Sequence, residues 1–121
     1  MPFKKIPVIL KTMDLKTRRF QELIEEQLST LAGLDFRRLF SGFGLYADDA
    51  VFGLIHGEKL YFYTSDVTRI KYQKLQRTFF ITPRSKKAMK RYWEVPVSVI
   101  ESKRMLMDWA LEAIEARRVE K

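Results

Sequence analysis

The segment Leu39–Tyr46, LFSGFGLY, places two glycines one residue apart and could cradle a phosphate. A Walker loop needs a lysine followed by serine or threonine after its last glycine, and a dinucleotide loop needs a third glycine and then a helix. Neither context is present, because Gly44 is followed by the alternating run Leu45–Ala47. We therefore interpret Gly42 and Gly44 as positions where the backbone or aromatic rings pack closely at the start of a strand.

Two further groups of side chains could do chemistry, and each has a simpler interpretation. Asp48 and Asp49 could form an acid–base pair, but aspartate is also favoured in a tight hairpin turn. His56, the only histidine, lies beside Gly57 and has no partner at a metal-ligating or base–nucleophile spacing. The chain has no cysteine, which excludes disulfides and thiolate metal sites. We expect no catalytic residue, no metal and no cofactor.

One segment accounts for the whole net positive charge of the chain. Between Val67 and Trp93 there are nine basic residues and no acidic one, whereas the rest of the chain holds 14 basic residues against 15 acidic ones. The nine are Arg69, Lys71, Lys74, Arg77, Arg84, Lys86, Lys87, Lys90 and Arg91. Such a segment either keeps the protein soluble or binds an anionic partner, and we expect nucleic acid. No helix-turn-helix, zinc finger or RNA-binding signature indicates base-specific reading.

The residues expected to contact phosphates are Lys86, Lys87, Lys90 and Arg91. They fall in a polar connection after Pro83 and in the strand that follows it. Side chains in an exposed loop and its flanking strand can reach the backbone of a nucleic acid without disturbing the core.

The hydrophobic periodicity predicts an α+β domain in two layers. A five-stranded antiparallel sheet packs against helices in the order α-β-β-β-α-β-β-α. A short turn is expected at Asp35–Leu39. The predicted helices are Lys16–Leu31, Asp66–Gln76, a short one near Ser98 and a last one after Ser102, and the predicted strands are Gly42–Ala47, Val51–Ile55, Lys59–Tyr63, Phe79–Thr82 and Met89–Val95.

Helix caps and inner faces follow from residue type and spacing. Asp66 and Ser102 are predicted N-caps, and Ser98 with Glu101 has capping-box spacing. The second helix is expected to bury its apolar positions, and the last helix to bury an apolar stripe. These positions are Val67, Ile70 and Leu75 in the second helix and Met105, Leu106, Trp109, Ala110, Ala113 and Ile114 in the last.

The consecutive aromatics Tyr61, Phe62 and Tyr63 could stack bases on a sheet face or pack in the core. Because successive strand residues point to opposite faces, at least one of them must be core. Trp93 and Trp109 are likewise expected to be core anchors.

The composition is that of a globular domain without a membrane span. Hydrophobic residues make up 46% of the 121 residues and charged residues 31%, and no apolar run approaches the ~18 residues of a membrane span. We expect one domain over residues 1–121, with residues 1–14 as an N-terminal extension. There is no signal-peptide pattern, so a cytoplasmic location is expected.

The sequence resembles the TfoX N-terminal domain family, the competence regulators also called Sxy. The resemblance runs from about Thr17 to Arg118, nearly the whole chain. Ser41 stands where the family often has a glycine, and the C-terminal helical domain of longer members is not among these 121 residues. The residues that match the family pattern are Phe40, Gly42, Phe43, Gly44, Leu45, Tyr46, Phe52, Gly53, Leu54, Ile55, Leu60, Tyr61, Tyr92, Glu94, Val95 and Pro96.

The resemblance implies a fold in the order read from periodicity and a positive regulator of DNA-uptake genes that works with the cyclic-AMP receptor protein at promoters. It supplies no catalytic residues. Two alternatives stay open: an interaction adaptor whose basic surface meets an acidic protein, and a small enzyme that uses a cleft on the sheet.

The glycine analysis predicts that the chain does not bind nucleotides, since the phosphate-binding lysine and helix N-terminus are missing. Calorimetric titration with ATP, GTP and NAD should give no binding heat. Micromolar affinity that is lost in a folded Gly44→Val variant would contradict this.

Overall fold

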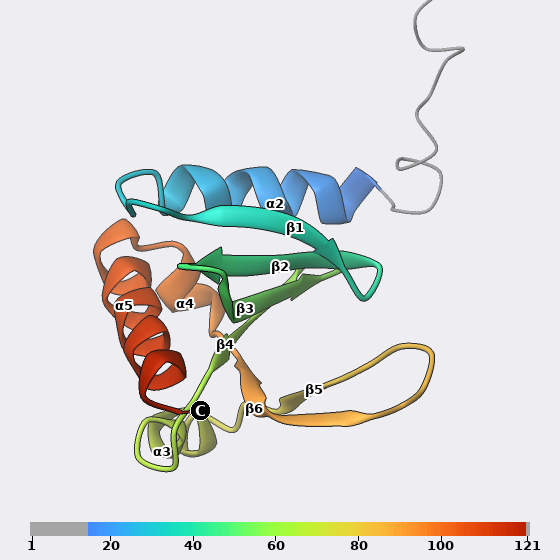
Figure 1. The fold of residues 1–121 in the computed structure, drawn as a ribbon, viewed down its shortest axis with the longest axis vertical. Coiled ribbons are helices and arrows are strands. Elements are labelled where there is room, and N and C mark those ends of the chain that lie inside the picture. Colours follow the sequence, from blue (N-terminus) through green and yellow to red (C-terminus); the bar gives the residue numbers. More distant parts are fainter. Residues whose placement is uncertain (1–14, 121) are drawn as a thin grey trace, which may run out of the picture.

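The computed structural model describes residues 15–120, and the expected N-terminal extension lies outside them. The described residues form a six-stranded antiparallel sheet in the order β1-β2-β3-β4-β6-β5, packed with helices (Figure 1). The α+β architecture is thus as predicted, with one more strand. The strands are β1 (Asp35–Leu39), β2 (Gly42–Ala47), β3 (Ala50–His56), β4 (Lys59–Tyr63), β5 (Phe79–Ile81) and β6 (Ala88–Glu94), and the helices are α2 (Leu15–Gln27), α3 (Arg69–Lys74), α4 (Val97–Ile100) and α5 (Lys103–Val119).

The additional strand is β1, which the sequence analysis expected to be a turn. It pairs with β2 from Asp35 opposite Tyr46 to Leu39 opposite Gly42. The adjacent arginines of DFRRL hide the alternation of a strand. The β1–β2 turn also lacks the usual glycine signal, because Phe40 and Ser41 adopt its positive φ angles.

The two glycines of β2 are required by close packing, as predicted. A Cβ atom on Gly42 would lie 1.9 Å from the carbonyl oxygen of Ile55, and one on Gly44 would lie 2.8 Å from the ring of Tyr46. Gly44 is followed by further strand residues rather than by a helix. The segment is therefore a buried strand start and not a phosphate loop.

The main core lies between the helices and one face of the sheet. Phe52 and Phe62 from the sheet meet Ile24 of α2 and Leu106 and Ala110 of α5 there. A second apolar cluster lies on the opposite face and joins β3, β4, β5, β6 and the end of α5. Its buried members are Leu54, Tyr61, Tyr63, Phe80, Tyr92 and Ala116. The consecutive aromatics of β4 are thus core residues on both faces.

The predicted inner face of the second helix is wrong. Val67 is 75% exposed and Ile70 47%, and Leu75 is also exposed, whereas Tyr72 is 1% exposed. A helix of six residues is too short for periodicity to select a face. The large ring of Tyr72 takes the buried position and packs edge-on against Trp109, with ring centroids 4.9 Å apart.

Two predicted caps are also wrong, and one is confirmed. Helix α3 begins after Thr68, and Asp66 instead pairs with arginines. Helix α4 begins after Pro96 with no side-chain cap, so Ser98 does not cap it. The Ser102 hydroxyl accepts a hydrogen bond from the Met105 amide at 3.2 Å, as expected of an N-cap.

The tryptophans lie at the edge of the core rather than inside it. Trp109 is half-buried, and the Lys71 ammonium lies 4.3 Å from the centroid of its ring. Trp93 is half-buried against Phe79 and donates its indole N–H to the Lys90 carbonyl at 3.0 Å. Within the predicted stripe of α5, Leu106, Ala110 and Ala113 are buried and Met105 is exposed.

The approach of Gly42 to Ile55 predicts a stability effect. Gly42→Ala forces Cβ against a backbone carbonyl, so it should reduce the free energy of unfolding by about 3 kcal/mol, the upper end of the usual overpacking range. Gly57→Ala is the control: it has open space around Cβ but a φ of 62°, and should cost about 1 kcal/mol. Urea unfolding measures both, and equal losses would contradict the steric argument.

Candidate nucleic-acid interface

The structure divides the nine predicted cations into two groups. Four of them make ion pairs with acidic side chains that lie outside the basic segment of the sequence. Arg69 pairs with Asp66, Lys71 with Glu112, Arg77 with Glu94 at 3.7 Å, and Arg91 with Asp66 at 3.0 Å and Glu120 at 3.6 Å. These cations are paired within the fold, so part of their charge is compensated.

Asp66 is the centre of this paired group. It precedes α3 and receives guanidinium groups from α3, through Arg69, and from β6, through Arg91. The hydrogen bond and charge of Arg91, and then the charge of Arg69, hold the pKa of the Asp66 carboxyl below its usual value. Arg91 was expected to contact phosphate, but it is instead turned toward Asp66 and Glu120.

The other five cations are exposed, and none has an acidic partner among residues 15–120. Lys74 is on α3. Arg84, Lys86 and Lys87 are in the loop between β5 and β6, and Lys90 is on β6. Four uncompensated cations therefore share one hairpin, which we call the basic hairpin (residues 79–94). In Figure 1 its loop extends to the side opposite α5.

The loop of the basic hairpin is organised by Thr82, which is buried. The Thr82 hydroxyl accepts a hydrogen bond from the Lys87 amide at 2.8 Å and lies 2.7 Å from the Ser85 hydroxyl. The Thr82 amide in turn donates to the Lys87 carbonyl at 2.9 Å, and Lys86 takes a positive φ of 58°. These bonds use the backbone and the small polar side chains, so the cationic side chains point into solvent.

The base of the hairpin is anchored in the second apolar cluster. Phe80 is buried, with its ring centroid 5.0 Å from that of Tyr61 and 5.9 Å from that of His56. The register between β5 and β6 shifts after Phe79, and the Trp93 indole donates to the Lys90 carbonyl across this irregularity. The anchor fixes where the cations stand relative to the sheet.

The other candidate residues have structural roles. Asp48 and Asp49 form the β2–β3 turn with φ angles of 52° and 63°, and Asp49 pairs with Arg37 at 2.8 Å. His56 ends β3 just before the turn at Gly57. Within residues 15–120 no three His, Cys, Asp or Glu side chains are grouped so that they could hold a metal ion, and no helix there is long and apolar enough to cross a membrane.

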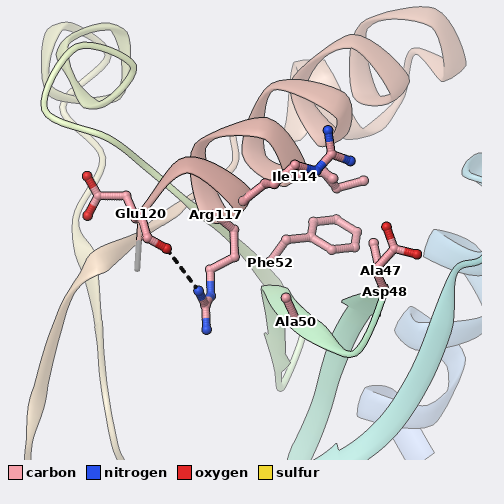
Figure 2. Close-up of a pocket in the computed structure, with 8 residues that line it drawn as sticks. Ala47, Asp48, Ala50, Phe52, Ile114, Arg117 and Glu120 are labelled. Atoms are coloured by element: carbon pink, nitrogen blue, oxygen red, sulfur yellow. Dashed lines mark hydrogen bonds between the residues drawn. The ribbon is translucent and has the colours of Figure 1, made fainter.

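A cavity of about 400 Å³ lies between the β2–β3 turn and the end of α5 (Figure 2). Phe52, Ala50 and Ile114 contribute apolar walls. Two arginines line the cavity, but both are engaged: Arg117 donates to the Val51 and Glu120 carbonyls, and Arg118 to the Glu115 carboxylate. Among residues 15–120, no serine, threonine, cysteine, lysine or histidine lines the cavity.

The sequence matches the model of a known protein family. The family model of the TfoX N-terminal domain matches residues 26–117. The chain belongs to the TfoX N-terminal domain family. The match confirms the resemblance read from the sequence, and the TfoX N-terminal domain is not a known enzyme family. No curated protein matches the chain.

Sequence reasoning missed the acidic partners of the cations. Asp66 and Glu94 stand just outside the ends of the basic segment, and the spacing of Asp66 to Arg69 is a local ion-pair signal. Glu112 and Glu120 come from α5 and could not be paired without the tertiary fold. The sequence also gives no sign of the positive φ of Phe40, which is visible only in the structure.

The lowered pKa of Asp66 predicts a pH dependence of stability. Because the folded protein prefers the ionised carboxyl, Asp66 should stabilise the fold above the ordinary aspartate pKa of ~3.9, and this contribution should be lost as pH falls through the lower folded pKa. Urea midpoints should therefore differ between wild type and Asp66→Asn at pH 7 and converge toward pH 2.

Asp48→Asn is the matched control, because no ion pair of Asp48 is found among residues 15–120. Its urea midpoint should follow wild type at every pH. An Asp66→Asn midpoint equal to wild type at pH 7 would show that the pairs with Arg69 and Arg91 do not stabilise the fold.

Proposed function

We propose that this chain is a non-enzymatic TfoX-like regulator of competence gene expression that contacts nucleic acid through the basic hairpin. Membership of the TfoX N-terminal domain family supports the regulatory part. As the family resemblance implies, its partners are the transcription machinery and the cyclic-AMP receptor protein. Regulation of this kind takes place in the cytoplasm.

The nucleic-acid part of the proposal rests on one observation: some cations of the basic segment have acidic partners and others have none in the part of the chain that the structure describes. Four cations of the basic segment have an acidic partner in the fold, as Arg69 and Arg91 have in Asp66. On the basic hairpin, Arg84, Lys86, Lys87 and Lys90 stand together with no such acid in the described residues. Closely spaced cations without counter-charges attract the phosphates of a nucleic acid and release its condensed counterions.

Binding through these side chains should depend on charge and only weakly on sequence. Lysines act as point charges toward phosphate, and none of the four cations is on a helix that could enter a major groove. The domain would then hold DNA in place while protein contacts supply the choice of promoter. An acidic protein partner would use the same cations, but its affinity would not fall with salt concentration in the linear log–log manner of a nucleic acid.

The salt dependence of binding to duplex DNA tests this proposal. If the hairpin engages four phosphates, the logarithm of the affinity should fall against the logarithm of salt concentration with a slope of about −3.6, which is about 0.9 per phosphate. The variant Lys86→Glu/Lys87→Glu should reduce the affinity and bring the slope to about −1.8. Fluorescence anisotropy with a labelled duplex measures both quantities.

The control variant is Arg19→Glu/Arg104→Glu, which changes the net charge equally at exposed positions on α2 and α5. It should bind nearly as wild type does. A slope near zero, or equal losses in the two variants, would reject DNA as the ligand of the basic hairpin and favour an acidic protein.

A further inference from the structure

Phe40 occupies a conformation that suits its side chain poorly. It has a φ of 53° in the β1–β2 turn, and its neighbour Ser41 has a φ of 66°. A bulky residue is rare in this left-handed region, where asparagine and glycine are favoured. The ring does not compensate by full burial, because Phe40 remains 39% exposed. Turn geometry disfavours a phenylalanine at this position, and packing against Phe80 covers only part of its ring.

The exposed ring lies next to the basic hairpin. Phe40 packs against Phe80 of β5 with ring centroids 5.9 Å apart. A small cavity of about 110 Å³ separates the β1–β2 turn from the hairpin loop, and Phe40, Ser41, Thr82, Pro83, Arg84 and Ser85 line it. Figure 1 shows the two loops on the same side of the sheet. An aromatic surface and the guanidinium of Arg84 therefore border one cleft.

We infer that Phe40 and the basic hairpin together bind single-stranded nucleic acid. An exposed aromatic ring beside a row of cations is the arrangement that binds single strands with little sequence preference, because every base has a face that can stack. The cavity of about 110 Å³ is too small to enclose a nucleotide, so a base would lie against the ring at its mouth. Its phosphate would then stand near Arg84 and the loop lysines.

This inference rests on the proposed function for its phosphate contacts and adds the stacking contact. In a duplex, the faces of the bases are already stacked on one another, and the ring has no base to meet. Single strands leave those faces free. The ring should therefore favour a single strand over a duplex that meets the same cations.

The test compares a labelled 12-nucleotide oligo-dT, a 12-unit abasic oligonucleotide with the same phosphates, and a 12-base-pair duplex. Phe40→Asn removes the ring and suits the left-handed backbone, so the turn should be retained. We expect it to weaken oligo-dT binding about fivefold or more, as loss of one stacked base does elsewhere. Binding to the abasic strand and to the duplex should change less than twofold.

Phe40→Tyr should bind oligo-dT as wild type does, and Phe40→Leu, which keeps an apolar side chain without a π face, should behave like Phe40→Asn. Circular dichroism checks that the variants are folded. If Phe40→Leu binds oligo-dT as tightly as wild type, or if it weakens all three ligands equally, the stacking contact is rejected.

The experiment distinguishes failure of the stacking contact from failure of the phosphate contacts. Lys86→Glu/Lys87→Glu should weaken all three ligands, because all carry phosphates. If this double variant binds normally, the phosphate contacts fail. If it binds poorly while the Phe40 variants bind oligo-dT normally, only the stacking contact fails.

Discussion

The fold depends on one strand, β4, that is buried on both faces. Leu60 and Phe62 point into the core beneath the helices, and Tyr61 and Tyr63 point to the opposite face, where they are also buried. A sheet with apolar side chains on both sides has to be covered on both sides to keep them from water. The helices cover one face. The opposite face is covered by residues of the edge strands, by the end of α5 and by the β5–β6 hairpin.

This requirement positions the candidate site. Phe80 and Tyr92 from the hairpin complete the second cluster with Tyr61 and Tyr63. Because Phe80 must reach Tyr61, the loop that follows it is held beside the β1–β2 turn and hence beside Phe40. Hydrophobic burial thus sets the place of a loop whose own residues are almost all polar. The cations of the loop contribute little to this packing, because their side chains are exposed.

Electrostatics adds a second level of organisation. The second cluster is closed by polar contacts around the end of α5, where Tyr63 donates to the Glu120 carboxylate at 3.1 Å and Tyr92 donates to the Val51 carbonyl at 3.1 Å. Arg91 joins the same region through Glu120. A cation inside this network lies close to its counter-charge, whereas the cations on the hairpin loop have no acidic partner among residues 15–120. Position in the fold therefore decides which cations remain available.

The α+β class, five of the six strands, the role of Gly42 and Gly44 and the segment that holds the excess charge could all be predicted from the sequence, because periodicity, turn residues and charge are local properties. Tertiary structure decided the rest. It made Asp35–Leu39 a strand by pairing it with β2, turned Tyr72 inward instead of Val67 and Ile70, and paired Arg91 with Asp66. The last two outcomes depend on contacts between residues distant in sequence, Tyr72 with Trp109 and Arg91 with Asp66, which local patterns do not reveal. The pairing of β1 with β2 is local, but neither the alternation of the strand nor the residues of its turn mark it in the sequence.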